Sequence, residues 1–254
     1  MEVQLDIHGG TDRNGNKEPV GRISLKTGDS LAVVGPTGSG KSELLADIEQ
    51  LADGDTPSRR TVRLLVNGLA PDVRLGASSV VATLSQRTNF IMDITVEDFV
   101  GMHAASLQRP QDVGADEVVA LANTLCGEPM RANSLLQRLS GGQTRALMIA
   151  DIALLSDAPV VLIDEVENAG IDKHLALSVL CGQGKIAITA THDPLLMLSS
   201  PARLVMSEGG MRAVLAVSPE EEKCRAALSV LDAKLLHARE SLRKGDMLQE
   251  EYVA

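Results

Sequence analysis

The chain has 254 residues, of which 44% are hydrophobic and 23% charged, and its formal net charge at pH 7 is −10. This composition is typical of a soluble globular protein built as one domain with an inserted lobe or as two small domains. The acidic balance argues against a nucleic-acid-binding protein, which needs clustered Lys and Arg. Aromatic residues make up only 1% of the chain, which argues against a stacking surface for single-stranded nucleic acid.

The N-terminal stretch "MEVQLDIHGG" has neither the basic nor the long apolar region of a signal peptide. No run approaches the roughly 18 apolar residues that span a bilayer, so a cytoplasmic protein is expected and any membrane role needs a separate partner chain. The cysteines Cys126, Cys181 and Cys224 have no metal-site spacing. We therefore expect reduced, buried, structural thiols.

Short apolar runs bounded by turn residues predict strands, and longer periodic runs between them predict helices. The predicted strands are 30–35, 79–85, 159–165, 185–191 and 202–209. The predicted helices of this part are 41–51, 143–155 and 173–180. Several of the strands are apolar throughout, as in a parallel sheet with helices on both faces, so the expected fold is an α/β fold with a mainly parallel sheet.

Between Arg87 and Arg138 the strand signal fades, and the stretches 95–107 and 115–126 have helical patterns. We interpret 87–138 as a small helical lobe inserted into a core formed by 1–86 and 139–217.

A C-terminal extension, 218–254, begins with Ser218, Pro219 and three Glu, which is a strong helix start. Its apolar seam is formed by Cys224, Leu228, Leu231, Leu235, Ala238 and Leu242, at alternating steps of four and three. Two interpretations stay open at this point. The helix packs back on the core, or it pairs with a second copy or a partner helix.

"GPTGSGKS" follows one predicted strand and precedes a helix, and it matches the phosphate-binding pattern G-x-x-x-x-G-K-[ST]. In such a loop, backbone N–H groups surround the β- and γ-phosphates of a nucleotide, and the helix adds its positive end. Lys41 is expected to neutralise phosphate charge and Ser42 to bind Mg²⁺.

"PVVLIDE" is a hydrophobic strand that ends in two carboxylates. We expect Asp164 to hold the Mg²⁺ hydration shell beside the phosphate loop. Glu165 would then point toward the γ-phosphate and polarise the attacking water. Glu167, two positions further, is expected to face the following loop rather than to act as the base.

"LSGGQ", 139–143, places Ser140 and two glycines before a helix, which makes a second anion site without a lysine. With the two motifs above, this stretch makes the chain resemble the ATP-binding cassette (ABC) ATPases, whose signature is LSGGQ. The resemblance covers about residues 1–215 and implies a P-loop NTPase core that binds ATP and Mg²⁺.

The resemblance also assigns roles to two residues that mean little alone. Gln86 in "LSQRTNF" matches the glutamine that links the metal site to the helical lobe, and His192 in "ATHDP" matches the histidine that contacts the γ-phosphate. Members of the family work as head-to-tail dimers, so each ATP would lie between 35–42 of one subunit and 140–143 of the other. A homodimer is the expected form.

These assignments give three groups of site residues. The expected catalytic residues are Glu165, His192, Lys41 and Gln86. The expected nucleotide-binding residues are Gly35, Pro36, Thr37, Gly38, Ser39, Gly40, Lys41, Ser42, Ser140, Gly141, Gly142 and Gln143. The expected Mg²⁺ ligands, direct or through water, are Ser42, Gln86 and Asp164.

The chain departs from the family pattern in two places. The N-terminal segment has no aromatic residue to stack on adenine, and His8 is the nearest planar side chain. Where transport cassettes commonly have DEPTSALD, this chain has "DEVENAGID", with Val166 in place of Pro, a glycine at 170 and one extra residue before Asp172. Asp172 is expected to close the loop that faces the opposite subunit.

Two functions follow from these features. The first is the energy-coupling subunit of an ABC transporter, which docks on a separate membrane permease. The alternative is a soluble cassette that acts in a cytosolic assembly, such as metal-cluster or cofactor maturation, and the altered loop favours it.

Overall fold

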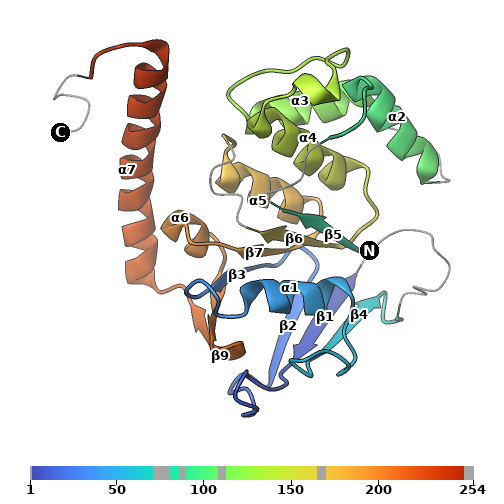
Figure 1. The fold of residues 1–254 in the computed structure, drawn as a ribbon, viewed down its shortest axis with the longest axis vertical. Helices are drawn as coiled ribbons and strands as arrows, with labels where there is room; N and C mark the ends of the chain where they lie inside the picture. Colours follow the sequence, from blue (N-terminus) through green and yellow to red (C-terminus); the bar gives the residue numbers. More distant parts are fainter. Residues whose placement is uncertain (1, 71–79, 86–89, 108–112, 165–169, 249–254) are drawn as a thin grey trace.

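The computed structural model describes residues 2–70, 80–85, 90–107, 113–164 and 170–248 (Figure 1). Its centre is a six-stranded sheet with the strand order β5-β6-β7-β3-β8-β9. The strands are β3 (Ser30–Val34), β5 (Val81–Leu84), β6 (Val160–Asp164), β7 (Ile186–Ala190), β8 (Ala202–Ser207) and β9 (Gly210–Ala216). The pairs from β5 to β8 are parallel, and β9 pairs antiparallel with β8. The predicted α/β fold with a mainly parallel sheet is therefore confirmed.

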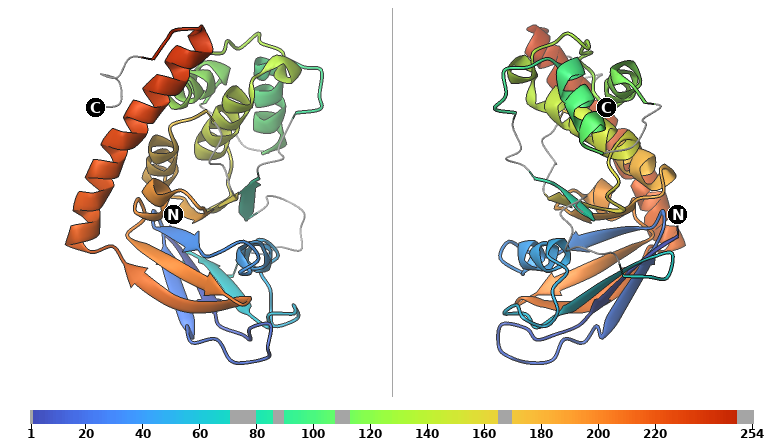
Figure 2. Two further views of the ribbon diagram at one scale, coloured as in Figure 1. Left: turned by 60° about the vertical axis from the view of Figure 1, so that its left-hand side comes forward. Right: turned by 90° about the vertical axis from the view of Figure 1, so that its right-hand side faces the viewer.

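A second sheet, of three antiparallel strands in the order β2-β1-β4, was not anticipated from the sequence. Its strands are β1 (Val3–His8), β2 (Arg22–Lys26) and β4 (Thr61–Val66). One face is buried, with Leu5 at 0% exposure and Leu64 at 3%. This face belongs to the same hydrophobic core as β3, so the small sheet forms a wall beside the main sheet (Figure 2).

Helix α1 (Lys41–Glu49) follows β3 and lies between the two sheets in Figure 1. Helices α5 (Lys173–Gly182) and α6 (Pro194–Met197) flank β7 in the chain. Three further helices gather at one end of the molecule: α2 (Val96–Ser106), α3 (Ala115–Leu125) and α4 (Gly141–Leu154). Two of them, α2 and α3, fall within the segment 87–138 that the sequence predicts to be a helical lobe.

These three helices share one hydrophobic core with β5, β6 and α5. Helix α4 is almost entirely apolar on its inner side, and Leu147 and Ala150 are completely buried. A short 3-10 turn, η2 (Leu136–Arg138), leads into α4. The helix that carries the LSGGQ stretch is thus anchored both to α3 and to the main sheet.

The C-terminal helix α7 (Pro219–Lys244) begins at Ser218 as the sequence predicts, and Ser218 and Glu221 form its capping box. Figure 1 shows it at the side of the molecule, where it contacts α6. The apolar seam is open, because Leu231, Leu235 and Leu242 are each more than half exposed. The interpretation that this seam packs back on the core is therefore wrong. An ion pair between Arg203 of β8 and Glu221 holds the first turn.

The expectation of buried cysteines is also wrong. Cys224 lies exposed on α7, and Cys126 and Cys181 are partly exposed. Partial burial still raises the pKa of the Cys126 and Cys181 thiols. Among the helices that the structure describes, none has both the length and the apolar character needed to cross a membrane.

Candidate functional site

The candidate site is built on one edge of the main sheet. Because β5, β6, β7 and β3 are adjacent and parallel, their carboxyl ends meet at the same edge. The chain leaves β3 into the phosphate loop, β6 ends at Asp164, and β7 is followed by His192. Gln86 comes shortly after β5 in the sequence but lies outside the described residues. The strand order alone therefore brings three separate motifs to one place.

Lys41 and His192 are in direct contact, although 151 residues separate them in the chain. Lys41 Nζ lies 3.1 Å from His192 Nε2, and it donates hydrogen bonds to the carbonyls of Gly35, at 2.9 Å, and Pro36, at 3.3 Å. The ammonium group is thus held at the mouth of the loop without a carboxylate among these partners. Among the contacts described for Lys41, none is an ion pair, so its charge is available to a bound phosphate.

The loop that holds His192 is itself fixed. Asp193 forms an ion pair with Lys173 of 2.6 Å and caps α6 by accepting from the N–H of Leu195. Its own N–H donates to the hydroxyl of Thr191. Burial would raise the pKa of Asp193, but the ion pair with Lys173 and the cap hold it below its usual value. The residues on both sides of His192, Thr191 and Asp193, are therefore held by hydrogen bonds.

The phosphate loop has the properties that an anion requires. Gly40 is the N-cap residue of α1, with φ of 101°, and no side chain caps this helix. The hydroxyl of Ser39 is buried and has no hydrogen-bond partner among the described residues. Since first-turn N–H groups of a helix need acceptors, the α1 end and this hydroxyl fit the phosphates of a nucleotide.

The residues expected to hold Mg²⁺ are only partly described. Ser42 is exposed in the first turn of α1, and Asp164 is half-buried at the end of β6, paired in register with Ala190. A hydroxyl and a carboxylate are oxygen ligands of the kind that Mg²⁺ prefers, so both fit the metal. Gln86, Glu165, Val166 and Glu167 lie outside the described residues.

The LSGGQ stretch is held by a capping box. Ser140 Oγ accepts from the N–H of Gln143, at 3.3 Å, and Gln143 Oε1 accepts from the N–H of Ser140, at 2.9 Å. Gln143 also donates to the carbonyls of Glu128 and Pro129. Gly141 accepts from Arg145, at 3.3 Å. None of the contacts described for Ser140–Gln143 joins them to residues 35–42 of the same chain.

Asp172 is the N-cap of α5, where it accepts from the N–H of Leu175 at 2.9 Å. Its N–H donates to the carbonyl of Leu125 at the end of α3. Gly170, with φ of 65°, approaches Gly142, because a Cβ on Gly170 would lie 3.7 Å from Gly142 Cα. Gly170 therefore lies against the signature stretch of its own chain.

A hollow of about 520 Å³ opens beside the phosphate loop. It is lined by Thr11, Asp12, Arg13, Gly15, Glu43, Pro57, Ser58, Arg59 and Gly209. Glu43 follows Ser42 directly, and Gly209 contacts Ser39, so the hollow borders the phosphate loop. His8 is half-buried at the end of β1 and is not among the lining residues. Polar and charged groups, not an aromatic ring, form this surface.

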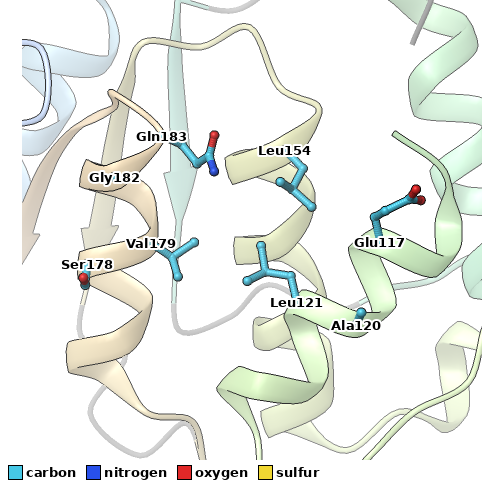
Figure 3. Close-up of a pocket in the computed structure, with 8 residues that line it drawn as sticks. All are labelled: Glu117, Ala120, Leu121, Leu154, Ser178, Val179, Gly182 and Gln183. Carbon is cyan, nitrogen blue, oxygen red and sulfur yellow. The ribbon is translucent and has the colours of Figure 1, made fainter. Parts of the chain in front are cut away.

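A larger hollow, of about 570 Å³, lies between α3, α4 and α5 (Figure 3). Leu121, Leu154 and Val179 point toward one another inside it. None of the residues that the sequence assigns to the site lines it. Its position and apolar lining separate it from the phosphate chemistry.

The turn between β8 and β9 belongs to the site, and sequence reasoning missed it. The N–H of Gly209 donates to the carbonyl of Ser39 at 2.9 Å, and a Cβ on Gly40 would lie 2.7 Å from Gly209 Cα. The only sequence signal was the pair Gly209-Gly210 between two apolar runs, which indicates a hairpin turn. The contact with the phosphate loop could not be read from that pattern.

Comparisons with known proteins place these features in a family. A family model described as "ABC transporter" matches residues 21–168, more than half of the chain. An uncharacterized ABC transporter ATP-binding protein of Methanocaldococcus jannaschii is 48% identical over 258 aligned positions, which cover 100% of this chain and 98% of the relative.

More distant relatives agree with this. An ATP-dependent lipid A-core flippase of Burkholderia thailandensis is 30% identical over 74% of this chain, which matches only 32% of that longer protein. Among solved structures, cbiO1 of Clostridium perfringens, described as part of an ABC transporter complex, has a TM-score of 0.60. The match covers 91% of this chain and 94% of that one, and at 22% identity it shows the shared fold alone.

Proposed function

Because this chain belongs to the ABC transporter family and is an ATPase, we propose that it drives a transporter by hydrolysing MgATP between two cassettes. The contact between Lys41 and His192 carries the proposal, since it joins the phosphate loop to the residue after β7 within hydrogen-bond distance. In this proposal the chain is the energy-coupling subunit, located in the cytoplasm beside a separate membrane permease.

Each residue of the site takes a defined part. Lys41 and the N–H groups of the loop bind the β- and γ-phosphates, and His192 contacts the γ-phosphate. Ser42 and Asp164 would hold Mg²⁺, which would neutralise phosphate charge. Gln86 would link the metal site to the helical lobe, and Glu165 would accept the proton of the attacking water.

The second half of the site is proposed to come from another copy of the chain. Ser140–Gln143 present a helix N-terminus without a lysine, and the described contacts do not join them to their own phosphate loop. In a head-to-tail homodimer, this stretch would close over the γ-phosphate held by the partner. Hydrolysis would then remove the shared ligand and reopen the pair.

The transporter interpretation is favoured over the soluble assembly. The relatives named above are described as transporter proteins or parts of transporter complexes, and none of them is an assembly factor. The altered loop before Asp172 remains the feature that sets this chain apart from common transport cassettes. The substrate that is moved would be selected by the permease.

The decisive experiment compares ATP hydrolysis by the parent protein with that of Glu165→Gln. Loss of a general base lowers the rate by about 10²- to 10⁴-fold, whereas ATP binding should persist and the closed dimer should accumulate. Glu220→Gln, at an exposed position on α7, is the matched control and should leave turnover unchanged. Normal turnover in Glu165→Gln would disprove the assignment of Glu165 as the general base.

Co-purification tests the transport role. A permease that co-purifies in detergent would support transport, and a purely soluble partner would contradict it.

A further inference from the structure

Arg60 is a completely buried charged side chain directly before β4. Its guanidinium donates to Glu18 Oε1, at 2.6 Å, to Asp47 Oδ2, at 2.9 Å, and to the carbonyl of Gly209, at 2.5 Å. The side chains of Arg60 and Glu18 are 0% exposed and that of Asp47 is 2% exposed. We call these residues, with Ser58, which donates to Asp47 at 2.7 Å, the Arg60 cluster.

The members of the cluster are well satisfied. Glu18 also accepts from the N–H groups of Gly10, at 2.9 Å, and Met211, at 2.8 Å. Burial would lower the pKa of Arg60, but its bonds to Glu18 and Asp47 outweigh that effect and raise it. The guanidinium therefore stays charged, as a buried partner of two carboxylates must.

A buried ionic cluster is seldom the most stable way to fill space, since well-packed apolar residues of similar volume often stabilise a protein as much. What such a cluster adds is a fixed geometry of its hydrogen bonds. A planar guanidinium holds its acceptors at fixed angles, so the segments that carry those acceptors are fixed relative to one another. Here the segments are the loop after β1, helix α1, the start of β4 and the β8–β9 turn.

Two of these four segments touch the phosphate loop. Asp47 lies on α1, the helix into which the loop runs. Gly209 lies directly behind the loop, where its N–H donates to Ser39 and its Cα leaves no room for a Cβ on Gly40. Arg60 thus binds both helix α1, through Asp47, and the β8–β9 turn, through Gly209, while none of its described hydrogen bonds goes to residues 35–42.

We propose that Arg60 is a positioning residue for the phosphate-binding loop, acting through Gly209 and Asp47. It holds the turn against Ser39 and Gly40, so the loop keeps its phosphate-binding shape before a nucleotide arrives. This inference rests on the proposed function, because it assumes that residues 35–42 bind the phosphates.

The test measures ATP affinity by calorimetry on the full chain with Mg²⁺, for the parent and two variants. Arg60→Lys keeps a buried cation but cannot bridge both carboxylates and the Gly209 carbonyl. The triple variant Arg60→Met, Glu18→Gln, Asp47→Asn removes all three charges, which avoids stranding a carboxylate if Arg60→Lys fails to fold. Arg63→Gln, at an exposed position on β4, is the control.

The positioning role predicts at least a tenfold loss of ATP affinity in both variants while the folded state persists, and no loss in Arg63→Gln. It also predicts slow solvent exchange in the nucleotide-free parent, and faster exchange in the variants, for two N–H groups: that of Ser39, which donates to the carbonyl of Pro36, and that of Gly209, which donates to the carbonyl of Ser39. A purely structural Arg60 would lower the unfolding midpoint but leave the affinity of the folded protein within twofold of the parent, which would overturn the inference.

Two further results separate this inference from the proposed function. Rapid exchange of the Ser39 and Gly209 N–H groups in the free parent would overturn the positioning role even if neither variant folds. Failure of the parent itself to bind ATP would instead overturn the assignment of the phosphate loop.

Discussion

Helices α1 and α4 both begin at stretches that the sequence assigns to nucleotide binding, but the N-terminus of α1 has no side-chain cap and that of α4 has a capping box. Helix α1 begins at Gly40, without a side-chain cap, and the turn behind it is held by the buried Arg60 cluster. Helix α4 begins at Ser140, which exchanges hydrogen bonds with Gln143, and this stretch is partly exposed. The first end is left open for a ligand on a fixed support. The second is satisfied by side chains of its own chain.

The largest effect is expected from a substitution at the N-terminus of α1. Lys41→Ala removes the cation that sits between the Gly35 carbonyl and His192. A hydrogen bond to a charged group contributes about 1.5–3 kcal/mol, so ATP affinity should fall by roughly 10- to 150-fold. Calorimetric titration with MgATP measures this loss.

Lys26→Ala, at an exposed position on β2, is the matched control and should bind like the parent. If Lys41→Ala binds ATP as tightly as the parent, residues 35–42 do not hold the phosphates.

The motifs and the parallel strands could be predicted because their signals are local. A glycine pattern between a strand and a helix, or an apolar run that ends in Asp164, needs no knowledge of distant residues. The start of α7 could also be predicted, from Ser218 and Pro219.

Other features depend on contacts that no local pattern contains. Arg60, in the stretch "SRRTV", looks like a surface residue until Glu18, 42 positions away, and Gly209, 149 positions away, are placed beside it. The sequence left the packing of the α7 seam open for a related reason. Periodicity shows that a helix has an apolar face, but not whether a neighbour covers it.

A smaller effect is expected at the capped N-terminus of α4. Ser140→Ala removes the cap of α4 and should lower the free energy of unfolding by about 1 kcal/mol, whereas Ser140→Gly should lower it by only a few tenths. Urea unfolding measures both. Nucleotide affinity of the single chain should not change, because the described contacts of Ser140 do not reach the phosphate loop. A tenfold loss of nucleotide affinity in the monomer would contradict the conclusion that Ser140 does not reach the phosphate loop of its own chain.

Near its C-terminal end, α4 makes a pH-sensitive contact that contributes less to the free energy of unfolding. His103 of α2 lies 2.9 Å from Asp151 of α4. The hydrogen bond to Asp151 raises the pKa of His103, and partial burial opposes it. A raised pKa in the folded state means that the contact stabilises fully below the unfolded value of about 6.5 and is lost as pH rises through the folded value.

Unfolding of the parent and of His103→Gln, compared at several pH values, checks this. The parent should exceed the variant by about 0.5–1 kcal/mol on the acidic side, and the difference should vanish on the alkaline side. A difference that grows with pH would reverse the sign and disprove the contact's role.

The smallest effect is expected on α7, which has the same type of cap as α4 but an uncovered apolar seam. Leu231 is 55% exposed, so Leu231→Ala removes few contacts and exchanges one good helix former for another. The free energy of unfolding should change by less than about 0.5 kcal/mol. Leu147→Ala, at a completely buried position on α4, should instead lose about 2–5 kcal/mol. Urea unfolding at low protein concentration measures both, and a loss above about 1 kcal/mol for Leu231→Ala would show that the seam is covered in solution.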